Sequence, residues 1–268
     1  MNDFQAVILG LVEGITEFLP VSSTGHLILT KSLLGLAGEP VDRHLIVIQG
    51  AAILAVCFEY RQRLWDTIGG VFSQPRAQRF VLVLLMAFLP LAILGLIFDK
   101  PIERLLFAPI PVAIALIVGG VLMLWAESRQ HVERIATVDD LRPSDGLKLG
   151  LFQALALFPG TSRSAATIIG GLLMGMNRRA ATEFSFLAAI PVLLAATFYK
   201  MWQARATLSF ADARPLLVSS VVAFIAALLS LRLLLRYVSQ HSFAVFAWYR
   251  IVFGLIVLGT WASGLIRW

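Results

Sequence analysis

The feature that most constrains this fold is a series of apolar stretches long enough to cross the hydrocarbon core of a bilayer, which takes roughly 20 residues of helix. Such stretches recur at about 80–98, 108–126, 184–202, 215–235 and 243–266, and a shorter one covers about 45–60. Because 59% of the 268 residues are hydrophobic and only 14% are charged, the chain has too little polar surface to cover a water-soluble globule. The sequence therefore predicts an all-α polytopic membrane protein surrounded by membrane lipids.

The net charge of +6 is compatible with nucleic-acid binding, but membrane orientation explains it better because the basic residues cluster in loops between predicted spans. We therefore expect no nucleic-acid partner. By the positive-inside rule, the face with the larger share of basic residues is cytoplasmic. That face carries Arg61, Arg63, Arg76, Arg79, Arg129, Arg134, Arg142, Lys148, Arg178 and Arg179, against Arg43, Lys100, Arg104, Lys200, Arg205 and Arg214 on the other. No basic residue precedes the first apolar run, so we expect no cleaved secretory signal there.

Two segments share one order of residue types, which indicates an internal duplication. Residues 10–13 (Gly-Leu-Val-Glu) match residues 150–153 (Gly-Leu-Phe-Gln), and with one gap the match continues from Phe18, Pro20, Ser22 and Ser23 to Phe158, Pro159, Thr161 and Ser162. We interpret residues 1–268 as a single membrane domain. Repeat 1 covers about 1–126 and repeat 2 about 147–268, and the charged loop 127–146 joins them.

Each repeat begins with two short helices separated by a proline and a Gly/Ser/Thr cluster: 4–19 and 23–36 in the first, 147–158 and 163–176 in the second. These helices are too short to span comfortably, and non-helical backbone at membrane depth needs protein or a watery cavity around it, which disfavours the alternative of four thin spans. We therefore predict two re-entrant hairpins, each followed by three transmembrane helices. Because three is an odd number, the second hairpin enters from the opposite face. The sequence thus predicts an inverted-topology repeat whose hairpin tips meet near the midplane.

The first hairpin carries two carboxylates inside the membrane. Glu13 and Glu17 are four residues apart, so both lie on one face of the predicted helix. Ionisable groups at this depth are costly and are usually functional, and Mg²⁺ or Ca²⁺ prefers oxygen ligands. We predict that Glu13 and Glu17 bind a divalent cation. The alternative is that they only cap a helix or pair with a nearby arginine.

Both hairpin tips offer groups that bind anions. The second helix of each hairpin begins beside hydroxyl side chains, and a helix N-terminus with free N–H groups attracts anions. In the second tip, Gly160 allows close backbone approach, and Arg163 supplies a forked donor suited to phosphate. Two such N-termini and an arginine suit a diphosphate. The predicted substrate-binding residues are Ser22, Thr24, Gly25, Gly160, Thr161, Ser162, Ser164 and Thr167.

Ser23 and His26 have the spacing of a nucleophile and its base. They are three residues apart on the second short helix, so imidazole could activate the serine hydroxyl. The alternative is that His26 is only a hydrogen-bonded polar residue. Water attack, and His26 as nucleophile, stay open beside Ser23. We assign no catalytic role to the other polar residues in apolar segments: Gln49, Gln153, Glu183, Ser185 and Arg250.

Residues 13–26 (Glu-Gly-Ile-Thr-Glu-Phe-Leu-Pro-Val-Ser-Ser-Thr-Gly-His) and 159–164 (Pro-Gly-Thr-Ser-Arg-Ser) closely resemble the bacterial undecaprenyl-diphosphate phosphatase family, the bacitracin-resistance type. The similarity continues through residues 179–186 and 190–191 to 249–250, so it covers essentially the whole chain. Ala165 departs from it, since the family usually has glycine there, and residues 50–52 (Gly-Ala-Ala) replace Leu-Gly-Ser. Neither departure removes a proposed functional group.

The resemblance implies a multi-pass enzyme of the bacterial inner membrane, dependent on a divalent cation, with its site facing the periplasm. It implies removal of one phosphate from undecaprenyl diphosphate, which regenerates the lipid carrier for peptidoglycan and other envelope polymers. The predicted catalytic residues are Ser23, His26, Glu17 and Arg163. The main alternative is a flippase or secondary transporter, because inverted repeats with broken helices are common among transporters. A homodimer and the tail length of the lipid are left open.

Overall fold

The computed structural model describes residues 1–106, 108–129, 132–205 and 213–264. Within these ranges the regular structure is helical, and six helices are long and apolar enough to cross a membrane. They are α3 (Glu39–Glu59), α5 (Pro75–Leu106), α6 (Pro109–Ser128), α9 (Arg178–Ala204), α10 (Ala213–Val238) and α11 (Ala244–Ala262). All six predicted spans therefore correspond to helices, which confirms the all-α polytopic membrane class. Residues 265–266 of the last predicted span lie outside the described residues.

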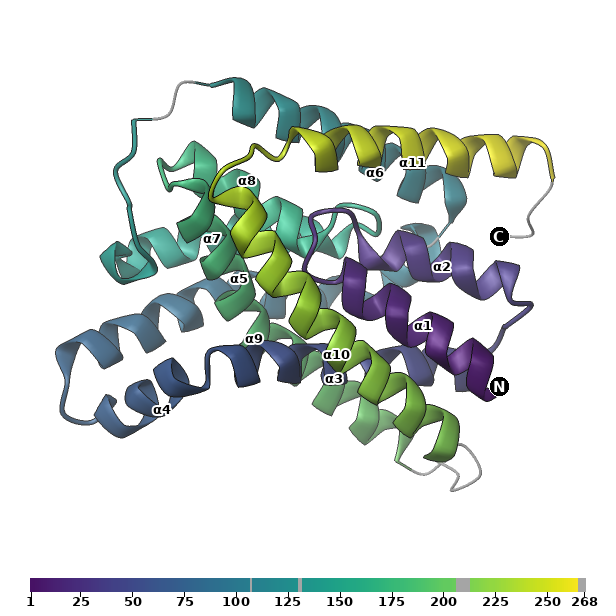
Figure 1. Ribbon diagram of the computed structural model, residues 1–268, viewed down its shortest axis with the longest axis horizontal. Coiled ribbons are helices and arrows are strands. Elements are labelled where there is room, and N and C mark those ends of the chain that lie inside the picture. The colour runs from purple at the N-terminus through teal and green to yellow at the C-terminus, as the bar shows by residue number, and fades with distance from the viewer. Residues whose placement is uncertain (107, 130–131, 206–212, 265–268) are drawn as a thin grey trace.

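Four shorter helices form two hairpins, α1 (Asp3–Thr16) with α2 (Ser23–Leu33) and α7 (Pro143–Ala154) with α8 (Arg163–Leu173). A 3₁₀ turn, η2 (Leu155–Leu157), extends α7 towards its tip. The second helices of the two hairpins coincide at a constant offset of 140 residues, from Ser23 to Arg163 and from Leu33 to Leu173. Figure 1 shows each pair of short helices lying among the longer ones.

Glycines let each hairpin pack closely on a long helix of the other half. A Cβ at Gly14 of α1 would lie 2.5 Å from the carbonyl oxygen of Ala223 in α10. In the other half, a Cβ at Gly150 of α7 would lie 2.6 Å from the carbonyl oxygen of Ala87 in α5. Small residues at such positions allow the close backbone contact that drives helix association in membranes. Since α5 and α10 are the second long helices of their halves, the two contacts correspond. The opposite membrane orientation of the halves stays a prediction.

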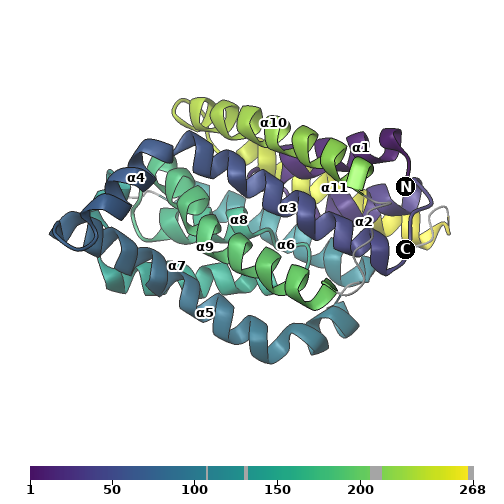
Figure 2. The same ribbon diagram turned by 90° about the horizontal axis from the view of Figure 1, so that it is seen from below.

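One described helix was not anticipated. The hydropathy pattern predicted a loop after the first span, whereas α4 (Arg61–Gly70) is helical there. Its residues are too polar and its length too short for a span, so the hydropathy pattern gave no signal for it. Another short element, the 3₁₀ turn η1 (Val138–Asp140), lies in the predicted charged loop. Figure 2 shows α4 at the end of the molecule opposite the N-terminus.

Candidate active site

The two hairpin tips are tied to each other by side-chain hydrogen bonds. Ser164, in the second tip, donates its hydroxyl to the carbonyl oxygen of Leu19 in the first, at 2.9 Å. Arg250 of α11 donates to both tips, through Nη1 to the carbonyl of Pro20 at 3.3 Å and through Nη2 to that of Gly160 at 3.1 Å. This arginine is fully buried, 0% exposed. The two tips therefore lie together, and the prediction that they form one functional site stays a prediction.

Each tip ends at a serine in a backbone conformation that residues other than glycine rarely adopt. Ser22 has φ 73° and Ser162 has φ 69°, both in the left-handed region. Each is also the N-cap of its helix, since the hydroxyl oxygen accepts from the N–H of Gly25 in one tip and of Ala165 in the other. Such strain is kept only where the surroundings enforce it, commonly at functional sites. The two predicted helix N-termini are therefore built alike.

Glu17, in the first tip, contacts both the predicted nucleophile and the arginine of the second tip. Ser23 donates its hydroxyl to Oε2 of Glu17 at 2.6 Å. The other oxygen of Glu17, Oε1, lies 3.6 Å from Nη2 of Arg163 in an ion pair between two buried side chains. A buried carboxylate is stabilised only with such partners. The contact of Ser23 that the structure gives is thus to Glu17, whereas the spacing along the sequence had paired it with His26.

Glu13 lies beside this cluster with no partner of its own. Its side chain is 1% exposed, and neither carboxylate oxygen has a hydrogen bond within the described residues. An isolated buried carboxylate is strongly unfavourable, so the position calls for a cation or a proton. Glu13 and Glu17 therefore fit a divalent ion. The described residues contain no group of three His, Cys, Asp or Glu side chains that could hold a metal, so further ligands would come from hydroxyls, water or substrate oxygens.

Two nitrogens of the Arg163 guanidinium form no hydrogen bond within the described residues. Its Nη1 donates to the carbonyl of Ser185 at 2.8 Å, which fixes the guanidinium, while Nε and Nη2 have no hydrogen-bond acceptor within the described residues. Thr167 forms hydrogen bonds with both Arg163 and Ser185. Its hydroxyl is fully buried and lies 2.8 Å from the hydroxyl of Ser185 and 2.9 Å from the carbonyl of Arg163. The free guanidinium edge can donate to a phosphate oxygen.

His26 is held by its own helix and by α11. Its Nδ1 lies 2.7 Å from the carbonyl oxygen of Ser22, which can only accept, so Nδ1 carries a proton. In the neutral ring, Nε2 then accepts from the hydroxyl of Tyr249, 2.6 Å away. The imidazole also stacks on Phe253, with ring centroids 4.1 Å apart. Neither aromatic partner was predicted, because nothing in a single sequence marks residues so distant along the chain.

The remaining predicted residues shape the tips. Gly160 has φ 94°, and a Cβ there would lie 2.4 Å from the carbonyl oxygen of Val112, so this position requires glycine. Gly25 is less restricted, since a Cβ there would meet its nearest atoms at ordinary contact distance, 3.5 Å or more. Thr24 lies in the first tip and Thr161 in the second, where the backbone N–H of Thr161 donates to the carbonyl of Phe158. Their predicted contacts with substrate stay predictions.

Comparison with known proteins places this geometry in context. The family profile of the bacitracin resistance protein BacA matches residues 6–256. An undecaprenyl-diphosphatase of Dechloromonas aromatica is 56% identical over 264 residues, which are 98% of this chain and 96% of that protein. The undecaprenyl-diphosphatase of Nitrosospira multiformis is 57% identical over 264 residues, 98% of this chain and 97% of that protein. That of Ectopseudomonas mendocina is 53% identical over 265 residues, 99% of this chain and 96% of that protein.

Proposed function

This chain belongs to the bacitracin resistance protein BacA family, and from that premise we propose that it hydrolyses undecaprenyl diphosphate to undecaprenyl phosphate and inorganic phosphate. The three relatives carry the name of this hydrolase and align along nearly their full length. The flippase alternative is therefore not favoured. The reaction would recycle the lipid carrier used for peptidoglycan and other envelope polymers.

The observation that carries the proposal is the meeting of a hydroxyl, a carboxylate and an arginine across the two tips. Ser23 and Arg163 come from different hairpins, and both contact Glu17. A transporter for an anionic lipid needs the arginine and the helix N-termini, but it has less use for a serine hydroxyl bonded to a buried carboxylate. Phosphoryl transfer can use all three groups, since it depends on positioning the nucleophile and on neutralising charge.

Ser23 is the proposed nucleophile. Its oxygen would attack the terminal phosphorus, and the bond to the bridging oxygen would break, releasing undecaprenyl phosphate. Oε2 of Glu17, 2.6 Å from the hydroxyl oxygen, is at the distance required of a general base. Water would then hydrolyse the phosphoserine. Direct attack by water at the same position, and His26 as nucleophile, are the alternatives that a labelling experiment separates.

Arg163 and the helix N-termini would stabilise the transition state. Nε and Nη2 of this guanidinium form no hydrogen bond within the described residues, although Nη2 lies 3.6 Å from Glu17, and Nη1 is held by the carbonyl of Ser185. The first N–H groups of α2 and α8 lack partners within their helices, as at every helix start. Such preorganised donors stabilise developing negative charge most effectively where water is excluded. Ser162 and Ser164, whose hydroxyl oxygens are 3.0 Å apart, would hold the second tip in place, since Ser164 donates its proton to the carbonyl of Leu19 and Ser162 then donates to Ser164.

Glu13 and Glu17 are the proposed ligands of a divalent cation, Mg²⁺ or Ca²⁺. The support is the carboxylate of Glu13, which is buried and has no partner among the described residues. When bound, the cation would supply electrostatic neutralisation of the diphosphate oxygens.

His26 would act as a proton shuttle, with Tyr249 holding Nε2 towards α11.

We also propose that the protein lies in the bacterial inner membrane with the site open to the periplasm. The described residues contain six candidate spans, and the arginines of the sequence are in excess on the face that the topology assigns to the cytoplasm. The duplication is supported by the constant offset between α2 and α8 and by the corresponding packing of α1 on α10 and α7 on α5, and we propose that the two halves are inverted.

The test is phosphate release from undecaprenyl diphosphate by purified protein in detergent, with and without a chelator. We expect chelation, Glu17→Gln and Arg163→Ala each to reduce the rate at least about 100-fold, the loss typical of a removed transition-state contact. Glu59→Gln is the matched control, because Glu59 is paired with Arg232 far from the tips. Substrate binding with no release by the wild type would contradict the hydrolase and favour the flippase.

The nucleophile is tested by rapid quench with substrate labelled on its terminal phosphate. Ser23→Ala is compared with Ser128→Ala, a control at an exposed serine whose hydroxyl donates to the carbonyl of Trp125. We expect label on Ser23 in the wild type and none in Ser23→Ala. Label on His26 would assign the nucleophile to the imidazole, and label on neither residue would leave direct attack by water.

A further inference from the structure

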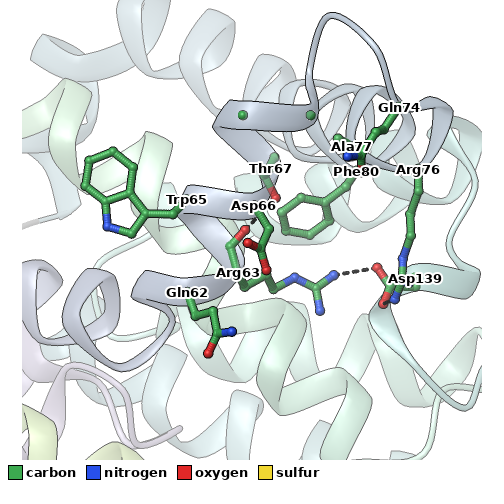
Figure 3. Close-up of a pocket in the computed structure, with 12 residues that line it drawn as sticks. Gln62, Arg63, Trp65, Asp66, Thr67, Gln74, Arg76, Ala77, Phe80 and Asp139 are labelled. Atoms are coloured by element: carbon green, nitrogen blue, oxygen red, sulfur yellow. Dashed lines mark hydrogen bonds and ion pairs between the residues drawn. The ribbon is translucent and has the colours of Figure 1, made fainter.

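A cavity that no residue of the tips lines lies at the end of the molecule that α4 occupies (Figure 2). Its volume is about 740 Å³, and its walls come from α4, the start of α5 and the turn η1. Figure 3 shows the side chains that line it, with Arg63, Arg76 and Asp139 gathered on one side. The proposed hydrolysis uses none of these residues. The cavity therefore needs an explanation of its own.

The position of α4 sets the depth of this cavity in the membrane. The candidate span in α3 ends at Glu59 and the one in α5 begins at Pro75, so the connecting segment lies where both spans leave the hydrocarbon core. Three large apolar side chains of this segment are nevertheless exposed: Trp65 at 71%, Ile68 at 62% and Phe72 at 94%. Their spacing puts the first two on one helix face. An amphipathic helix with exposed tryptophan is typical of the lipid headgroup region.

Two arginines in the cavity form ion pairs with the same carboxylate, that of Asp139. Nη2 of Arg63 lies 2.7 Å from Oδ1 of Asp139, and Nη2 of Arg76 lies 2.6 Å from Oδ2 of the same residue. The guanidinium of Arg63 is also fixed over the ring of Phe80, 4.3 Å from its centroid. A guanidinium has five N–H donors, so these bonds leave most of them available. The pair is thus preorganised for an oxyanion such as a phosphodiester.

The cavity also contains a negative group that no arginine neutralises. Asp66 is exposed and lines the same wall, and in the described part of the chain it forms no hydrogen bond or ion pair. A pure anion would be repelled by this carboxylate, so a simple phosphate is a poor match. A ligand that carries a phosphate and an ammonium group would satisfy both the arginine pair and Asp66.

We propose that this cavity binds the headgroup of an aminophospholipid, with its phosphodiester on Arg63 and Arg76 and its ammonium on Asp66. The acyl chains would lie against the exposed face formed by Trp65 and Ile68. Basic pockets between transmembrane helices bind the phosphate groups of lipid headgroups. The interfacial depth of α4 makes a lipid, rather than a soluble zwitterion, the occupant.

The test is native mass spectrometry of delipidated protein titrated with phosphatidylethanolamine, phosphatidylcholine or phosphatidylglycerol of identical chains. We expect phosphatidylethanolamine to bind about fivefold more tightly than phosphatidylcholine, whose quaternary ammonium cannot donate to Asp66. Asp66→Asn should remove this preference and leave residual binding. The double variant Arg63→Gln/Arg76→Gln should lose binding of both lipids. Arg214→Gln is the matched control, since Arg214 is an exposed arginine paired with Asp3 on a different pair of helices.

Three outcomes would overturn the proposal. If phosphatidylglycerol binds most tightly, the cavity selects lipids by negative charge alone and not by their ammonium group. Equal binding of all three lipids to wild type and variants would mean that no headgroup site exists. Displacement of phosphatidylethanolamine by millimolar inorganic phosphate would assign the arginine pair to a soluble anion. Asp66 is exposed, so Asp66→Asn keeps the test decisive even if the double arginine variant fails to fold.

Discussion

Gly119→Ala is the smallest change that tests how the two tips are held together. Gly119 of α6 faces the guanidinium of Arg250, and a Cβ there would lie 2.1 Å from Nη2 and 2.9 Å from Cζ. Because ordinary contact begins at about 3.5 Å, the guanidinium would have to retreat by more than about 1 Å. Nη2 is the atom that donates to the carbonyls of Ala115 at 3.2 Å and Gly160 at 3.1 Å. One methyl group should therefore break both bonds.

The expected cost follows from those two bonds. A hydrogen bond from a charged donor contributes about 1.5–3 kcal/mol, and alanine regains up to about 1 kcal/mol as a better helix former than glycine. Loss of two such bonds costs about 3–6 kcal/mol, so the net destabilisation is about 2–6 kcal/mol. For a chain of this size each kcal/mol lowers Tm by roughly 2–4 °C. Because the second tip loses its link to Arg250, we also expect phosphate release to fall by at least about tenfold.

The assay is scanning fluorimetry and phosphate release, both in detergent. Gly259→Ala in α11 is the control, because nothing lies within 4 Å of the position that its Cβ would take. It should leave Tm unchanged or slightly raised. If Gly119 acts through Arg250, then Gly119→Ala should cost little in an Arg250→Met background. Unchanged Tm and activity for Gly119→Ala, or full additivity with Arg250→Met, would refute the reasoning.

Three further predictions concern packing, the tip conformation and acid stability. Gly14→Ala would place a methyl group 2.5 Å from a backbone oxygen of α10. It should therefore destabilise the folded protein by about 1–3 kcal/mol and lower Tm, whereas the control Gly259→Ala should not lower it. Ser162→Gly accepts φ 69° without strain, so it should lower Tm less than Ser162→Ala, which loses the cap and keeps the strain. Burial alone would raise the pKa of Asp139, but the hydrogen bond from Arg76 and nearby positive charge outweigh it, and the pKa is lowered. The stability that Asp139 contributes is then present above its ordinary pKa and is lost as pH falls through the lowered folded value. Tm measured from pH 7 to pH 3 should fall less steeply in Asp139→Asn, and parallel curves would contradict this.

The sequence by itself determined the membrane class, the six spans and the two hairpins. These features follow from local chemistry, since a long apolar run must cross the bilayer and a proline with hydroxyl residues ends one short helix and starts the next. The same local rules identified Glu13, Ser23 and Arg163 as the polar groups of the tips. These rules did not predict α4, because its ten residues mix polar and apolar types and are too few to give the hydropathy signal of a span.

Only the tertiary structure decided which of these groups meet. Glu17, and not His26, is the hydrogen-bond partner of Ser23, because the bend at the tip turns the serine back towards the first helix. His26 instead contacts Tyr249, which is 223 residues away in sequence. Arg250, which the sequence left without a catalytic role, is buried between the tips. Such pairings depend on how helices from both halves pack, and spacing along one helix does not encode that.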